Sequence, residues 1–88
     1  MYILYIRPSL EKKLKKIGKR DPKKAEIISK KVKEILQDPC RYKNLKAPLS
    51  KWKRVHIDKH FVLTFSIDEK RKIVILEDYD HHNNIYKH

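Results

Sequence analysis

The segment KWKRVHIDKHFVLTFSI, residues 51–67, contains two alternating runs that decide the fold class. The runs cover residues 51–57 and 61–67. Val55 and Ile57 share one face of the first run, and every second residue of the second run, from 61 to 67, is apolar. Val55 and His56 therefore point to opposite sides of the first run. Alternation with a period of two is typical of half-buried strands, so the segment predicts an antiparallel hairpin with one apolar face.

The same alternation places two histidines on the polar face of this hairpin. If Val55 and Phe61 both face the core and pair, His56 lies opposite His60 and beside Arg54. Directly opposed residues have Cβ atoms about 5 Å apart. Two imidazoles and a guanidinium on an uncovered sheet face predict a phosphate-handling cluster. The alternative is that both histidines are ordinary half-exposed strand residues, and the turn that must close the hairpin contains no glycine.

The sequence on either side of the hairpin predicts two more strands. Residues 2–6 are aromatic and β-branched, which favours a first strand. Residues 73–76 are apolar on both faces, which suits a central strand. A polar tail follows the last strand. We expect the turn before this strand to consist of the four polar residues 68–71.

Apolar stripes at helical spacing predict two helices between the first strand and the hairpin. The stripes consist of Leu10, Leu14 and Ile17, and of Ala25, Ile28, Val32, Ile35 and Leu36. Gly18 occupies the place of a left-handed residue just beyond the first helix. Asp21-Pro22 is typical of an N-cap followed by proline in the first turn, and Asp38-Pro39 ends the second helix. About three residues then link the helices, which predicts an antiparallel hairpin.

These elements follow the order β-α-α-β-β-β and predict an α+β fold. We expect an N-terminal strand, an antiparallel helix hairpin on one face, and a three-stranded antiparallel stretch that completes one twisted sheet. A length of 88 residues indicates a single domain, residues 1–88.

The charge of the chain is high and unevenly distributed. The 23 Lys and Arg residues exceed the 11 Asp and Glu residues, for a formal net charge of +12. Residues 1–46 hold 15 of the basic and 5 of the acidic residues, a net charge of +10. This excess predicts a polyanionic partner, most simply nucleic acid. The single Cys excludes an internal disulfide, and no apolar run is long enough to span a membrane, so we expect a cytoplasmic protein without a membrane partner.

The tail, residues 78–86, is rich in side chains that can do acid–base chemistry. If it is helical from His82, then His82 and Tyr86 share a face at a spacing of four residues. A metal site is the less favoured alternative, because adjacent histidines on a regular element diverge. Its candidate ligands are Asp78, Asp80, His81 and His82.

Three stretches in this order resemble the RelE/ParE superfamily of toxins from toxin–antitoxin systems. They are residues 46–49, the hairpin residues 54–57 and 61–65, and residues 80–86. The preceding helix hairpin also fits, so the resemblance covers nearly the whole chain. The chain is most similar to the histidine-containing branch typified by YafQ.

The resemblance implies a role for each matching residue. His56 matches a catalytic strand histidine, and His82 matches the C-terminal histidine of the site. His60 stands where the YafQ-like pattern has a catalytic Asp, and Tyr86 matches an aromatic residue that stacks on a substrate base. Lysine and arginine residues would stabilise the phosphate charge; these are Arg54, Lys53, Lys46 and Lys43.

The pattern also departs from its relatives. Val62 and Asp80 stand where RelE itself has catalytic Arg residues, and Ala47 stands where the YafQ-like pattern has another His. A mechanism based on imidazoles is therefore favoured over one based on Arg and Lys.

The resemblance implies a ribosome-dependent mRNA endonuclease that inhibits translation without a metal or other cofactor. Its implied partners are a cognate acidic antitoxin similar to RelB, and the ribosome with mRNA in the A site. The helix hairpin and the loop lysines would contact rRNA phosphates; the helix lysines are Lys12, Lys13, Lys15, Lys16, Lys19, Lys23, Lys24, Lys30 and Lys31. Two alternatives stay open, a ParE-like gyrase poison and a non-catalytic RNA- or DNA-binding module.

Overall fold

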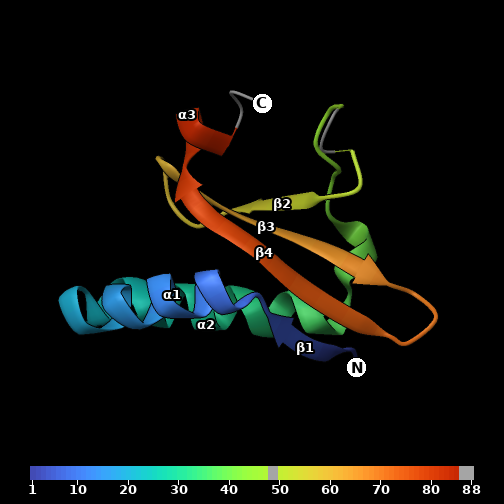
Figure 1. Cartoon of the computed structure of the whole chain (residues 1–88), viewed down its shortest axis with the longest axis horizontal. Helices are drawn as coiled ribbons and strands as arrows, with labels where there is room; N and C mark the ends of the chain where they lie inside the picture. The colour runs from blue at the N-terminus through green and yellow to red at the C-terminus, as the bar shows by residue number, and fades with distance from the viewer. Residues whose placement is uncertain (48–49, 86–88) are drawn as a thin grey trace.

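The computed structural model describes residues 1–47 and 50–85 and contains one sheet with two long helices on one side of it (Figure 1). The elements in chain order are β1 (Ile3–Ile6), α1 (Pro8–Arg20), α2 (Pro22–Gln37), the 3-10 turn η1 (Pro39–Arg41), β2 (Lys53–His56), β3 (Phe61–Asp68), β4 (Ile73–His81) and α3 (His82–Ile85). The expected α+β architecture and the order of its elements are confirmed.

The sheet has the strand order β1-β4-β3-β2 and is mixed. β2 and β3 pair in antiparallel fashion, as do β3 and β4. β1 instead lies parallel to β4, with Ile3 opposite Ile73 and Ile6 opposite Leu76. A parallel pair needs a long crossover connection, and this one contains the helix hairpin and the β2–β3 hairpin.

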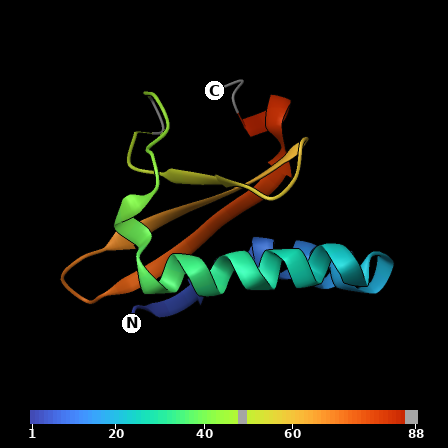
Figure 2. The ribbon, with the colours of Figure 1, turned by 180° about the vertical axis from the view of Figure 1, so that it is seen from behind.

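The two helices form the expected hairpin, but their link is shorter than the sequence predicts. Figure 2 shows α2 and α1 side by side along the same edge of the molecule. A single residue, Asp21, separates them; its backbone N–H donates to the Ile17 carbonyl at 2.8 Å. Its side chain accepts a hydrogen bond from the backbone N–H of Lys24 at 3.1 Å, so the predicted N-cap is confirmed.

The prediction that Gly18 ends α1 in a left-handed conformation is wrong. The helix continues to Arg20, and no glycine of the described residues has a positive φ. A Cβ at Gly18 would lie 3.9 Å from the Cβ of Ala25, which is ordinary contact. The capping of α2 by Asp21, rather than a left-handed glycine, therefore ends the first helix.

The main core lies between the helices and the sheet. It contains the apolar stripes of both helices and the inward faces of β2, β3 and β4. Its buried members are Leu10, Ile28, Ile35, Val55, Ile57, Leu63, Phe65, Val74, Leu76 and Tyr79. The faces that the sequence assigns to Val55, Ile57, Leu63 and Phe65 are thereby confirmed.

A second, smaller apolar cluster covers part of the opposite face of the sheet. Val62 is fully buried there against Leu45 and Ile85, and Trp52 packs beside them. Thr64, next to Val62 on the same face, is also fully buried. The expectation that this face is uncovered is therefore wrong around Val62, because α3 and the loop before β2 lie on it.

The last strand is longer than predicted because it contains a bulge. Phe65 pairs with Leu76 but Thr64 pairs with Asp78, so Glu77 is an extra residue. The Glu77 carboxylate accepts hydrogen bonds from Ser66 Oγ at 2.6 Å and Arg7 Nε at 2.9 Å. The bulge reverses the alternation and returns Tyr79 to the helix side of the sheet. β4 therefore continues through residues 77–81, of which 78–81 were predicted as tail.

Candidate active site

Two histidines from distant parts of the chain meet at the end of the sheet. His56 is the last residue of β2 and His82 is the first residue of α3. Their rings are stacked with centroids 6.0 Å apart and planes 27° apart, and both residues are exposed. The main chain of His82 is held in place, because its backbone N–H donates to the His60 carbonyl at 2.6 Å.

A second pair of histidines lies next to the first. His60, in the β2–β3 loop, stacks on His81 with centroids 5.8 Å apart and planes 12° apart. His81 Nδ1 accepts the backbone N–H of Asn83 at 3.1 Å, so the proton of a neutral His81 lies on Nε2. Sequence reasoning considered His81 only as a metal ligand and missed its contact with His60. The pairing of Phe61 with His81 between β3 and β4 creates this contact.

The predicted pairing of His56 with His60 is wrong. Val55 pairs with Leu63 rather than with Phe61, so His56 lies opposite Val62. The shift by two residues keeps every side chain on its predicted face but moves His60 into the loop. The reason is that the hairpin closes where the Ile57 N–H donates to the Phe61 carbonyl at 3.0 Å.

A carboxylate closes this loop in place of the missing glycine. Asp58 Oδ1 accepts the backbone N–H groups of His60 at 2.8 Å and Phe61 at 2.9 Å. Asp58 Oδ2 lies 2.6 Å from Lys24 Nζ, at the start of α2. The hydrogen bond from Lys24, aided by those from the loop backbone and opposed by partial burial, lowers the pKa of Asp58 from 3.8 to about 2.

A second carboxylate, that of Asp80, lies near the end of β4, just before α3. Asp80 Oδ1 accepts the backbone N–H of His81 at 2.7 Å and Asn84 Nδ2 at 3.1 Å. Burial alone would raise the pKa of Asp80, but these hydrogen bonds outweigh it and the pKa is lowered. The bond to Asn84 ties the end of β4 to α3, which carries His82.

The four basic residues predicted to bind phosphate differ in their surroundings. Lys53 Nζ donates to the Tyr42 carbonyl at 3.0 Å and to Asn44 Oδ1 at 2.8 Å, so it holds the loop before β2. Lys43 and Lys46 are exposed on that loop, and the Lys43 carbonyl accepts the Arg54 backbone N–H at 3.2 Å. Arg54 itself is half-buried on β2, two residues from His56.

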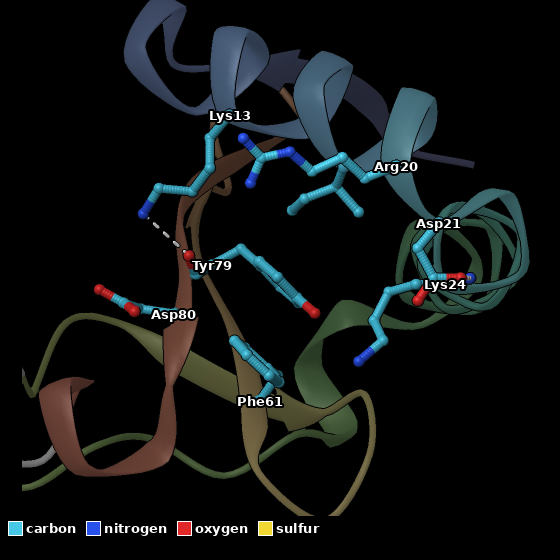
Figure 3. A pocket seen from close by; sticks show the side chains of 8 residues that line it. Lys13, Arg20, Asp21, Lys24, Phe61, Tyr79 and Asp80 are labelled. Atoms are coloured by element: carbon cyan, nitrogen blue, oxygen red, sulfur yellow. Dashed lines mark hydrogen bonds between the residues drawn. The ribbon is translucent and has the colours of Figure 1, made fainter.

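A pocket of about 330 Å³ lies on the helix side of the sheet, beside the second histidine pair (Figure 3). Its wall contains the stacked rings of Phe61 and Tyr79, whose centroids are 5.3 Å apart; Phe61 also meets the ring of His81 edge-on. Lys13 and Lys24 also line the pocket. Each forms an ion pair, Lys13 with Asp78 at 3.0 Å and Lys24 with Asp58 at 2.6 Å. These two lysines, which are among those predicted to contact rRNA, join the helix hairpin to β4 and to the β2–β3 loop.

Two other expectations concern the tail. Tyr86 lies outside the described residues. Within residues 1–47 and 50–85, no three His, Cys, Asp or Glu side chains converge as a metal site would require, and Asp78 is paired with Lys13. The alternative metal site at Asp78, Asp80, His81 and His82 is therefore not formed. Among residues 1–47 and 50–85, no helix is long and apolar enough to cross a membrane.

Most of the fold and most of the sequence match one family of known proteins. Residues 4–86 match the family model described as the ParE toxin of the type II toxin–antitoxin system parDE. The chain belongs to the RelE/ParE superfamily of type II toxins. One curated relative has a name that agrees with this assignment, and a second is similar over nearly the whole chain. This toxin is 59% identical over 87 residues to the putative toxin RelE4 of Methanocaldococcus jannaschii, covering 99% of this chain and 93% of the relative. It is 60% identical over 86 residues to an uncharacterized protein of Methanosarcina mazei, covering 98% and 100%.

Solved structures of other toxins share the fold of this toxin. The YoeB/ParE toxin from Agrobacterium tumefaciens superposes with a TM-score of 0.80 at 12% identity, over 91% of this chain and 98% of that one. The isolated RelE toxin of E. coli gives 0.73 at 18% identity, over 92% and 84%. A toxin chain of the YoeB-YefM complex from Staphylococcus aureus gives 0.78 at 15% identity, over 93% and 98%. The expected RelE-like fold is confirmed, and structural homologues of this toxin form complexes with antitoxins.

Proposed function

We propose that this toxin is a ribosome-dependent mRNA endonuclease that uses histidine acid–base chemistry, as in the YafQ-like branch of the superfamily. The observation that carries the proposal is the stacking of His56 on His82, with ring centroids 6.0 Å apart at an exposed end of the sheet. The two imidazoles come from different elements and flank one small region of surface. Histidine is suited to both proton transfers of RNA cleavage near neutral pH.

The reaction requires a base, an acid and cations around one phosphate. The 2′-oxygen attacks the adjacent phosphorus, its proton passes to a base, and the bond from phosphorus to the 5′-oxygen breaks as an acid protonates that oxygen. We assign His82 as the acid and either His56 or His60 as the base. The contact of the His56 ring with His82 favours His56, because both rings can then reach one phosphate. The products are a 2′,3′-cyclic phosphate and a 5′-hydroxyl.

Binding groups are proposed around this centre. Lys43 and Lys46 are exposed on the adjacent loop and Arg54 lies on β2, so these three would neutralise phosphates of the mRNA. Lys53 would contribute by holding that loop. Tyr86 would stack on a base next to the scissile phosphate.

The larger partners follow from the charge. Several lysines of α1 and of the start of α2 are exposed, and we propose that they contact rRNA when the toxin occupies the A site in the cytoplasm; they include Lys12, Lys16, Lys19 and Lys23. A net charge of +12 and the antitoxin complexes of its structural homologues support an acidic antitoxin as the regulating partner.

The test is single-turnover cleavage of a defined mRNA on programmed ribosomes, followed by analysis of the new 3′ ends. We expect a cyclic phosphate or its 3′-phosphate hydrolysis product, and a rate for His82→Ala lower by about 10²-fold or more. The matched control is Asn83→Ala, which alters the next exposed side chain of α3 and removes no proton-transfer group. New 3′-hydroxyl ends, or full cleavage by His82→Ala, would refute the mechanism.

A second candidate is a poison of DNA gyrase, because the family model that matches residues 4–86 is described as a ParE toxin. The same proteins distinguish the two functions in a supercoiling assay with purified gyrase. Inhibition of gyrase by wild type and His82→Ala alike, without mRNA cleavage, would establish this candidate. Binding to RNA or DNA without either activity would instead indicate a non-catalytic module.

A further inference from the structure

The β2–β3 loop that carries His60 is held by one side chain. Asp58 Oδ1 accepts the backbone N–H groups of His60 and Phe61 at 2.8 and 2.9 Å. The loop contains no glycine. The Asp58 side chain stabilises its turn instead, by accepting hydrogen bonds from the loop backbone. The position of the His60 main chain therefore depends on Asp58.

The second oxygen of the same carboxylate is held from another element. Asp58 Oδ2 lies 2.6 Å from Lys24 Nζ, and the side chains are only 32% and 24% exposed. Lys24 sits in the first turn of α2, where its backbone N–H is bound by the cap Asp21. Its ammonium group also lies 4.7 Å from the centroid of the Phe61 ring. Lys24 thus joins the first turn of α2 both to the loop, through Asp58, and to the start of β3, through Phe61.

The loop in turn positions the start of α3. The His60 carbonyl accepts the backbone N–H of His82 at 2.6 Å. The His82 ring stacks on that of His56, the last residue of β2, which is the strand that leads into this loop. A displacement of the His60 main chain therefore moves His82 relative to His56.

We propose that Asp58 and Lys24 are positioning residues that fix His82 against His56 by anchoring the His60 main chain to α2. Neither residue transfers a proton to or from the substrate. The catalytic consequence rests on the proposed function, whereas the positioning itself concerns only the free toxin. Because Lys24 belongs to the basic helix hairpin, the pair also joins the proposed rRNA-binding element to the proposed active site.

Three variants separate the parts of this arrangement. Asp58→Ala removes the hydrogen bonds of the carboxylate to the two loop N–H groups and its ion pair with Lys24. Asp58→Asn keeps an oxygen for the loop N–H groups but loses the charge that Lys24 binds. Lys24→Met keeps most of the apolar stem over Phe61 and loses only the ammonium group.

The chain offers a matched control in its other hairpin. Asp68 Oδ1 accepts the backbone N–H of Arg71 at 3.1 Å, and its carboxylate lies 4.0 Å from Arg71 Nε. Asp68→Ala therefore removes the same kind of contact from the β3–β4 turn, remote from the histidines along the sheet. Lys70→Met, in the exposed part of that turn, is the control for Lys24→Met.

The first measurement is made on the free toxin by NMR. We record hydrogen exchange of the His82 amide and the ring signals of His56 and His82. In Asp58→Ala we expect the His82 amide to exchange about tenfold faster or more, because its acceptor is no longer held in place. Asp58→Asn and Lys24→Met should lie between Asp58→Ala and wild type. The two control variants should match wild type.

The second measurement is single-turnover cleavage on saturating ribosomes, with the Kd for the ribosome determined in parallel. Asp58→Ala should lower the cleavage rate by about tenfold or more through loss of geometry, with Kd changed by less than about threefold. Asp58→Asn should recover part of the rate, which general loss of stability would not explain.

The outcomes separate this inference from the proposed function. Unchanged His82 exchange and ring signals in all three variants would overturn the positioning role, whatever the cleavage assay shows. If Asp58→Ala does not fold, the same comparison is made with Asp58→Asn and Lys24→Met. If wild type does not cleave mRNA, the proposed function fails and the NMR measurements alone decide the positioning role.

Discussion

The ion pair of Asp58 with Lys24 should make the stability of this toxin depend on pH in a defined direction. The pKa of Asp58 is about 2 in the folded protein and 3.8 ordinarily. A carboxyl group whose pKa is lowered on folding contributes stability above its unfolded pKa and loses that contribution as the pH falls through the folded value. Acidification from pH 5 to pH 2 should therefore remove most of it.

The size of the effect follows from the two pKa values and from exposure. A difference between 3.8 and about 2 corresponds to an upper limit of about 2.4 kcal/mol. The Asp58 side chain is 32% exposed, so water and salt screen the interaction, and we expect about 1 kcal/mol. For a domain of 88 residues, this free energy corresponds to a change in Tm of about 5 °C.

The assay is thermal unfolding followed by circular dichroism for wild type and Asp58→Asn between pH 7 and pH 2. The variant should melt about 5 °C below wild type at pH 7, and the difference should shrink to a small fraction of this near pH 2. The control Asp68→Asn weakens an exposed pair with Arg71 and should change stability by less than about 0.5 kcal/mol. A deficit for Asp58→Asn that is as large at pH 2 as at pH 7 would refute the reasoning, because it could not come from the charge.

Three further predictions test other parts of the molecule. Ile85 is 3% exposed in the smaller apolar cluster, so Ile85→Ala should lower the free energy of unfolding by about 2 kcal/mol in urea titrations and reduce cleavage; Ile27→Ala, at a residue 40% exposed, is the control for loss of apolar volume. Ribosome affinity should fall steeply with salt, because exposed helix lysines that bind rRNA phosphates displace counterions from the RNA. The triple change of Lys12, Lys16 and Lys19 to Ala should flatten the plot of log Kd against log salt, and an unchanged slope would exclude these lysines from the rRNA contact. Tyr86→Ala should slow single-turnover cleavage by about tenfold, because stacking on a base is worth about 1–3 kcal/mol; an unaltered rate would remove Tyr86 from the site.

Local periodicity in the sequence determined the elements and the faces of this toxin. The stripes of α1 and α2 and the alternation in β2 and β3 each arise within one segment, so the burial of Ile28, Val55 and Leu63 could be predicted. The capping of α2 by Asp21 is likewise a local property, since the residues involved are three positions apart. The charge excess of the helix hairpin needs no structure at all.

Only the tertiary structure decided how the histidines are paired. The alternation of the sequence predicted that His56 and His60 share a face of the hairpin. The register of β2 against β3, however, depends on how the loop between them closes. The carboxylate of Asp58, which closes this loop, is bound by Lys24, 34 residues away along the chain. The partner of His56 depends on β4, whose bulge at Glu77 extends the strand to His81 and brings His82 to the hairpin. These contacts join residues far apart in sequence, and no pattern within one segment carries information on such distances. The sequence therefore determined which residues are available for the site, whereas packing of β2, β4 and α3 decided which of them meet.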